Sequence, residues 1–134
     1  MKLRLTPRSV RIRLNQSEVA KFTHSGQLLD RVEFPGPTTT AFVYSLRSAR
    51  ELGTGSAHII NGELQVMVPQ GQVKSWANDA KEVGLYYTQG SQGGPTLRIA
   101  IEKDFQCVDG PPEERDPAAY SNPVAKDGCG TGSR

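Results

Sequence analysis

The sequence predicts an α+β fold in which a mainly antiparallel sheet, strongly curved or closed as a barrel, carries two short helices. Several segments alternate apolar and polar residues, as half-buried strands do. Two short segments instead space their apolar residues three and four apart, which is the helical pattern. An Asn-Gly dipeptide and several turns that contain Gly or Pro separate the strand segments, and such short turns favour antiparallel hairpins.

The chain opens with two alternating segments, Lys2–Leu5 and Ser9–Leu14, joined by the turn Thr6-Pro7-Arg8. Because proline fixes a backbone dihedral of the turn, we expect these segments to form a hairpin. Alternation predicts that the core-facing residues of the two strands are Leu3, Leu5, Val10, Ile12 and Leu14. The residues expected on the outer face are Lys2, Arg4, Arg11 and Arg13.

The first helix is predicted to run from about Gln16 to His24. Asn15 is a favoured N-cap residue, and Glu18 stands three positions later, where its side chain can bond back to the cap. Gly26 follows the last turn, where helices commonly end in a left-handed conformation. Both ends of this helix therefore carry their usual signals.

The remaining elements follow from the same two periods. Further strands are expected at Leu28–Phe34, Thr39–Leu46, Ala57–Ile60, Glu63–Val68, Val83–Thr88 and Leu97–Phe105. Asn61-Gly62 predicts a tight hairpin, because both of its positions tolerate a positive φ. Pro69 is expected to open a second helix, whose apolar stripe is Val73, Trp76 and Ala77.

Two segments of the chain, 11–22 and 65–76, resemble each other when one is laid over the other. Ile12 then falls on Val66 and Phe22 on Trp76, and each copy reads as a strand that leads into a short helix. This predicts two strand-strand-helix-strand-strand halves, 1–50 and 56–105. Only two identities support the match, and any strand-to-helix junction has a similar pattern, so duplication and chance similarity both stay open.

The length predicts one domain, with residues 1–106 as an α+β body. Residues 107–134 are rich in Pro, Gly, Asp and Glu and hold few large apolar side chains. Such a segment buries too little apolar surface to offset its ordering entropy, so we expect an irregular or partly disordered tail.

Composition narrows the function classes. The net charge of +2 indicates no strong field towards nucleic acid or an anionic membrane. The sequence holds no apolar run long enough to span a bilayer, and arginines interrupt the N-terminal region where a signal peptide needs an apolar stretch. We therefore expect a soluble cytoplasmic protein, in which Cys107 and Cys129 are free thiols.

Arg4, Arg11 and Arg13 on the expected outer face are the first candidate binding residues. Arginine forks match phosphate and carboxylate oxygens bidentately, so this face could grip a phosphate or an acidic partner. The alternative is cross-strand pairing with acidic residues such as Glu33, Glu63 and Glu102. The low net charge and the lack of interleaved aromatic residues favour that alternative and disfavour nucleic-acid binding.

A second candidate lies at the end of the last strand, where Glu102 and Asp104 share a face and Lys103 points the other way. Two carboxylates in a pocket could perform acid–base work, in an enzyme with a site near Glu102–Cys107. The competing interpretation is a solvated strand end with an ion pair that fixes register. We assign no catalytic residue.

A metal site could draw on Cys107 and Cys129, but their spacing fits no tight pattern of structural zinc. The sequence contains neither a P-loop nor the usual zinc or hydrolase motifs, so we expect no metal and no cofactor.

The segments SVRIRLNQSEV, IEKDFQC and YSNP, with a tryptophan helix followed by V-G-L, resemble a family of small uncharacterised bacterial proteins. That family carries an R-x-R-L-x-Q-x-E-V opening and an E-K-D-F-x-C strand end. The resemblance covers most of residues 1–123 and implies one intact small domain. It transfers no active site, because the family has no assigned function.

The sequence therefore points to a small binding or accessory protein without a recognisable catalytic centre. The first alternative is a phosphate or nucleic-acid binder that uses the basic hairpin face, and the second is an enzyme. The partner, whether a protein or a small molecule, and the oligomeric state stay open.

Overall fold

The structure is a computed structural model that describes residues 1–105, of which Met1–Asp104 form one compact unit. In chain order, the elements of this part are β1 (Lys2–Thr6), β2 (Ser9–Leu14), α1 (Gln16–Ser25), β3 (Gln27–Phe34), β4 (Thr40–Ala49), β5 (Ser56–Ile60), β6 (Glu63–Pro69), α2 (Gln70–Asn78), β7 (Gly84–Gln89) and β8 (Leu97–Lys103). The predicted tail falls at 107–134, outside the described residues.

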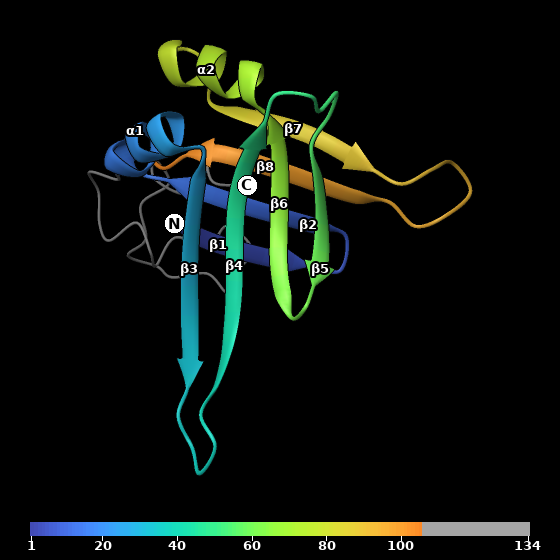
Figure 1. The fold of residues 1–134 in the computed structure, drawn as a ribbon. Coiled ribbons are helices and arrows are strands. Elements are labelled where there is room, and N and C mark those ends of the chain that lie inside the picture. Colours follow the sequence, from blue (N-terminus) through green and yellow to red (C-terminus); the bar gives the residue numbers. More distant parts are fainter. Residues whose placement is uncertain (106–134) are drawn as a thin grey trace, which may run out of the picture. The chain divides into compact units, whose positions relative to one another are not determined.

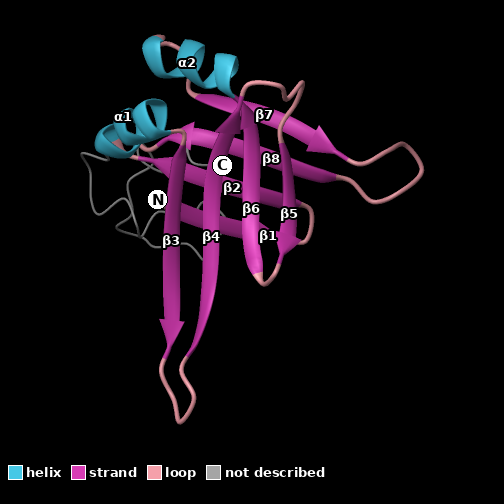
Figure 2. Ribbon diagram, in the orientation of Figure 1, coloured by secondary structure: helices cyan, strands magenta, loops and turns pink. Residues whose placement is uncertain are grey.

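The strands form two four-stranded sheets. The first sheet has the order β1-β2-β8-β7 and the second has the order β3-β4-β6-β5. The strands of one sheet run across those of the other, and both helices lie together at one end (Figures 1 and 2). The α+β class with two short helices is confirmed, and most neighbouring strands are antiparallel, as predicted.

The sheet differs from the prediction in its division, because two open sheets replace the expected single curved sheet or barrel. The central pair of each sheet is parallel: β2 pairs with β8, and β4 pairs with β6. Each sheet thus takes two strands from each half of the chain, and its outer strands remain edges. Periodicity describes which face of a strand is buried, and it carries no information on pairing between segments so far apart in sequence.

The element order confirms the predicted strand-strand-helix-strand-strand halves. The offset that lays Ile12 over Val66 also carries β1 onto β5 and the start of α1 onto the start of α2. If β1, β2, β3 and β4 correspond to β5, β6, β7 and β8, the order β1-β2-β8-β7 becomes β5-β6-β4-β3. This is the order of the second sheet, read from its other edge. The origin of this arrangement by duplication stays a prediction.

The inner faces of the two sheets and one side of each helix enclose a single core. It includes Ile12, Leu14, Phe22, Leu46, Val66, Trp76 and Ile101, all essentially inaccessible. The expected alternation in β2 is confirmed, because Val10 is 4% exposed. Leu5 was expected in the core but is 52% exposed, because it lies near the end of β1, an edge strand, whereas Leu3 on the same strand packs against the core.

The predicted cap of α1 is present at both ends. The Glu18 N–H donates to Asn15 Oδ1, and the Asn15 N–H donates to Glu18 Oε1, each at 2.9 Å. The helix continues through Ser25, just beyond the predicted end, and Gly26 terminates it with φ 77°. The reciprocal cap satisfies donors that a free helix end would leave without partners.

Pro69 differs from its predicted role. It is the last residue of β6 and the N-cap of α2, with φ −66° and ψ 131°, and the helix begins at Gln70. Pairing with Ala49 of β4 keeps the Pro69 backbone extended. The predicted stripe of α2 is confirmed, since Val73 and Trp76 are buried. Within the described residues, no helix is long and apolar enough to cross a membrane.

Trp76→Ala should lower the free energy of unfolding by roughly 3–5 kcal/mol, because the fully buried ring would leave a cavity. The change also removes the 3.1 Å hydrogen bond from Trp76 Nε1 to the Val83 carbonyl. Urea denaturation measures the effect, with the neighbouring exposed Ser75→Ala as the control. A loss no larger than that of the control would show that Trp76 is not part of the core.

Candidate functional site

The outer face of the first sheet gathers most of the predicted site residues. Alternation along β2 turns Arg11 and Arg13 away from the core, and the strand register sets Arg4 opposite Arg11 and Glu102 beside Arg13. We call this surface the arginine face, and it consists of Lys2, Arg4, Arg11, Arg13, Tyr86, Arg98, Glu102 and Asp104.

Glu102 lies at the centre of the arginine face and is only 6% exposed. Its Oε1 atom forms ion pairs with Arg11 Nε at 3.3 Å and with Arg13 Nε at 3.7 Å. Its Oε2 atom accepts a 2.8 Å hydrogen bond from the Tyr86 hydroxyl. One buried carboxylate therefore orients two guanidinium groups and one phenol.

This position corrects the interpretation of Glu102 as part of a solvated strand end. Glu102 stands on β8, the central strand next to β2, so neighbours cover it on both sides. The cross-strand pairing proposed for the arginines does occur with Glu102. Glu33 and Glu63, the other expected partners, lie on the second sheet and pair there with Arg31 and Arg47.

Tyr86 and Gly84 complete the cluster, and sequence reasoning assigned neither of them to it. Burial and the hydrogen bond to Glu102 raise the pKa of Tyr86 to about 12, although Arg11 and Arg13 act in the opposite direction. Gly84 makes room for this contact. A Cβ atom there would lie 2.7 Å from the Tyr86 hydroxyl and 2.9 Å from Glu102 Cγ. The V-G-L motif was the available signal for Gly84.

Asp104 lies at the margin of the face and forms a 2.7 Å ion pair with Lys2. The charged groups of the face are five basic side chains and two carboxylates. These charged groups lie together on the outer face of the first sheet.

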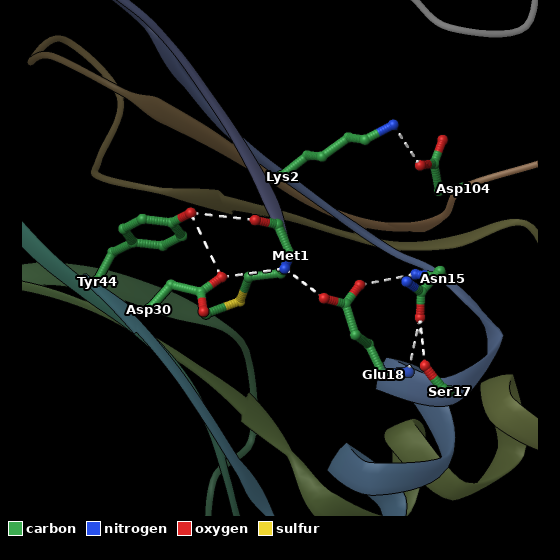
Figure 3. Close-up of polar contacts among 8 residues, drawn as sticks. All are labelled: Met1, Lys2, Asn15, Ser17, Glu18, Asp30, Tyr44 and Asp104. Atoms are coloured by element: carbon green, nitrogen blue, oxygen red, sulfur yellow. Dashed lines mark hydrogen bonds and ion pairs between the residues drawn. The ribbon is translucent and has the colours of Figure 1, made fainter. Parts of the chain in front are cut away.

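A second polar cluster surrounds the N-terminal ammonium group (Figure 3). This group pairs with Glu18 and, at 3.0 Å, with Asp30, while the Tyr44 hydroxyl donates to the Met1 carbonyl at 3.0 Å. Burial lowers the pKa of the ammonium, but the two carboxylates outweigh that effect, so its pKa lies above 8.0. The cluster joins β1, α1, β3 and β4 and acts as a structural tie.

The outer face of the second sheet holds a third cluster around Glu63. Its Oε2 atom accepts from Ser45 Oγ at 2.6 Å and from Arg47 Nη2 at 3.0 Å. These hydrogen bonds lower the pKa of Glu63. Arg47 also donates to Gln27 Oε1 at 3.0 Å. The donors and acceptors satisfy one another, so this cluster offers little to a ligand.

A hollow of about 630 Å³ lies beside α2 and β7 and is lined in part by Arg50, Gln72 and Tyr86. It is open to solvent and brings no group of polar side chains to one point. Within the described residues, no group of His, Cys, Asp and Glu side chains could hold a metal ion. Cys107 and Cys129, the candidate thiol ligands, lie outside the described residues.

Comparison with known proteins adds the family and nothing on activity. Residues 1–124 match the model described as "Family of unknown function (DUF7009)". No curated protein and no solved structure matches the chain.

Glu102→Gln should lower the free energy of unfolding by about 2 kcal/mol, because hydrogen bonds to a charged group contribute about 1.5–3 kcal/mol each and the amide keeps part of them. The change leaves Arg11 and Arg13 side by side without their shared anion. Thermal or urea unfolding measures the loss. The control is Glu33→Gln, which removes the carboxylate of the exposed ion pair with Arg31. Equal effects of the two variants would contradict a structural role for Glu102.

The N-terminal cluster should make stability depend on alkaline pH. The ammonium has a raised pKa in the folded chain, so its contribution is complete below pH 8.0 and is lost as pH rises through the folded-state pKa. Asp30→Asn should flatten the loss of stability as pH rises above 8.0. Urea unfolding across this range tests it. An unaltered profile would mean that Asp30 does not hold the ammonium.

Proposed function

The chain belongs to the DUF7009 family, and we propose that it is a binding protein that holds an acidic segment of another protein on the arginine face. The observation that carries this proposal is the arrangement around Glu102, which orients Arg11 and Arg13 on the outer face of the first sheet.

The orientation of the guanidinium groups favours binding. Arginine recognises carboxylates through a planar fork, and holding that fork in place lowers the side-chain entropy lost on association. Glu102 supplies this restraint from a buried position, and Tyr86 adds an exposed ring beside it. Tyrosine and arginine are among the residues most enriched at binding surfaces.

An acidic protein segment fits the face better than nucleic acid does. A nucleic-acid footprint is usually a strongly basic patch with several aromatic residues for stacking. The arginine face contains two carboxylates, Glu102 and Asp104, and its single aromatic residue is Tyr86. A short acidic peptide needs fewer contacts and can place its carboxylates between the basic side chains.

Catalysis at this cluster has weaker support. With a pKa of about 12, Tyr86 keeps its proton at neutral pH and does not offer a phenolate. Glu102 already forms ion pairs with Arg11 and Arg13 and accepts a hydrogen bond from Tyr86, so a general base role would require breaking those contacts. The Cys107 part of the enzyme hypothesis falls outside the described residues.

We expect poly-glutamate to bind the full chain in a salt-dependent manner, measured by calorimetry at low and high salt. The double variant Arg4→Gln, Arg98→Gln should weaken binding about tenfold, since each screened charge pair contributes up to about 1 kcal/mol.

The matched control is Arg31→Gln combined with Lys21→Gln, which removes the same charge from β3 and α1, away from the arginine face. Equal weakening in both double variants would mean that net charge alone binds the polymer, and the proposed site would fall. Duplex DNA binding more tightly than poly-glutamate would favour the nucleic-acid alternative instead.

A further inference from the structure

The free edge of β1 presents backbone groups to solvent at Leu3 and Leu5. The Arg98 N–H donates to the Arg8 carbonyl, and the Asp104 N–H donates to the Leu14 carbonyl. The backbone N–H and C=O groups of the even-numbered residues in β2 therefore point towards β8. The backbone groups of Arg11 and of the other odd-numbered residues in β2 point towards β1, where Arg11 pairs with Arg4. The N–H and C=O groups of Leu3 and Leu5 then point away from β2.

The corresponding edge in the second half of the chain is closed. Ala57 on β5 is the counterpart of Leu3 on β1, because each is the second residue of the first strand of its hairpin. The Gln89 side chain accepts from the Ala57 N–H at 2.7 Å and donates to the Ala57 carbonyl at 3.0 Å. One carboxamide thereby makes both hydrogen bonds that the backbone of an added strand would make to Ala57.

Strand registers identify the residue that takes the place of Gln89 in the first half. Leu28 pairs with Leu46 on β4 as Leu85 pairs with Ile101 on β8, so β3 and β7 correspond at these positions. Val32 follows Leu28 at the same distance along the chain as Gln89 follows Leu85, so Val32 is the counterpart of Gln89. A valine cannot donate or accept hydrogen bonds.

Neighbouring contacts support this correspondence. Just before Val32 on the same face of β3, Asp30 contacts the N-terminal ammonium of Met1. At the equivalent place before Gln89, the ring of Tyr87 packs so closely on Gly55 that a Cβ there would lie 2.4 Å from it. Met1 and Gly55 are themselves counterparts, since each directly precedes the first strand of its half.

The correspondence assigns the side chain of Val32 the place relative to β1 that the side chain of Gln89 holds beside β5. Within the described residues, no hydrogen bond reaches the outward N–H or C=O of Leu3. The two halves of the chain therefore differ at this point: a carboxamide closes one edge, and the other edge stays open.

The inner faces of β1, β3 and β5 carry exposed apolar side chains. The β3–β4 hairpin extends past β1 and past the rest of the first sheet (Figure 1). Leu5, Val32, Phe34 and Ile59 have the inner-face parity of their strands, yet each is between 44% and 66% exposed. Phe42, the partner of Val32, stacks on Tyr44 at 5.9 Å between ring centroids. We call Leu5, Val32, Phe34, Phe42 and Ile59 the apolar overhang.

We propose that the edge of β1 accepts an extended segment of a partner protein as an additional strand, with acidic and apolar residues in alternation. The proposal deepens the proposed function, because the acidic residues of the added strand would lie beside Lys2 and Arg4 on the arginine face. The apolar residues would lie on the opposite side, against the apolar overhang. Strand addition supplies affinity through the backbone and specificity through alternate side chains.

A second copy of the chain fits this edge less well than an acidic segment. Antiparallel pairing of two β1 strands centred on Arg4 would set Arg4 directly opposite Arg4, and like charges so placed destabilise a pair. Basic residues on an edge strand also oppose unspecific strand pairing. An acidic strand turns the same charges into attraction.

The test uses the full chain and a short synthetic peptide that alternates glutamate with valine. Titration should show saturable binding and slower amide hydrogen exchange at Leu3 and Leu5. Val32→Gln, which copies the Gln89 cap, should weaken binding at least about tenfold, a loss of about 1.4 kcal/mol. Leu29→Gln is the matched control, because it makes a similar change on the outer face of β3 and should leave affinity unchanged.

Each result separates the edge from the arginine face. Binding that Val32→Gln leaves intact, or that slows no exchange at Leu3 and Leu5, would overturn strand addition while the arginine face stands. Equal affinity for a peptide that alternates lysine with valine would overturn the stated chemistry of the partner. If the chain associates with itself and Val32→Gln abolishes that association, the occupant of the edge is a second copy of the chain and not an acidic segment. Failure of both this peptide and poly-glutamate would remove the proposed function as well.

Discussion

The two parallel strand pairs, β2 with β8 and β4 with β6, are the constraint on which the rest of the structure depends. Each pair joins one half of the chain to the other, so neither half completes a sheet on its own. An isolated hairpin is marginal in water, whereas four strands with a shared core are stable. An arginine–glutamate contact crosses each pair on its outer face: Arg13 with Glu102 in the first sheet, and Arg47 with Glu63 in the second.

These pairings also determine where a partner can approach. They place β8 beside β2, which brings Glu102 under Arg11 and Arg13 and creates the arginine face. They leave β1 and β5 as corresponding edges of the two sheets. The two halves then differ by individual side chains on a common backbone plan. Gln89 closes the β5 edge, and Val32 takes the equivalent place at the β1 edge. Function is most readily sought in such differences.

Local features of the fold were accessible from the sequence because neighbouring residues determine them. Asn15, Glu18 and Gly26 define α1 through contacts within a few residues. Asn61 and Gly62 define their hairpin because both adopt positive φ, 51° and 78°. The division into two sheets was not accessible, because the parallel pairs join segments that lie far apart along the chain. The same limit explains the misplacement of Leu5, since its alternation is correct and only the cover above it is missing.

The candidate site was predicted in part. Arg11, Arg13 and Glu102 were named from the sequence, and their pairing was one of the alternatives considered. Tyr86 and Gly84 were missed because their role depends on the pairing of β7 with β8, which sets Gly84 opposite Glu102. The significance of Val32 was equally hidden. A valine in a strand looks ordinary until its counterpart, Gln89, is seen to bond the opposite edge.

Amide hydrogen exchange in the isolated full chain tests the difference between the two edges most directly. The account predicts strong protection of the Ala57 amide, which Gln89 holds at 2.7 Å, and exchange at least roughly a hundredfold faster at the outward amide of Leu3. Equal protection at Leu3 and Ala57 without any partner would contradict it, because the edge of β1 would then already be closed.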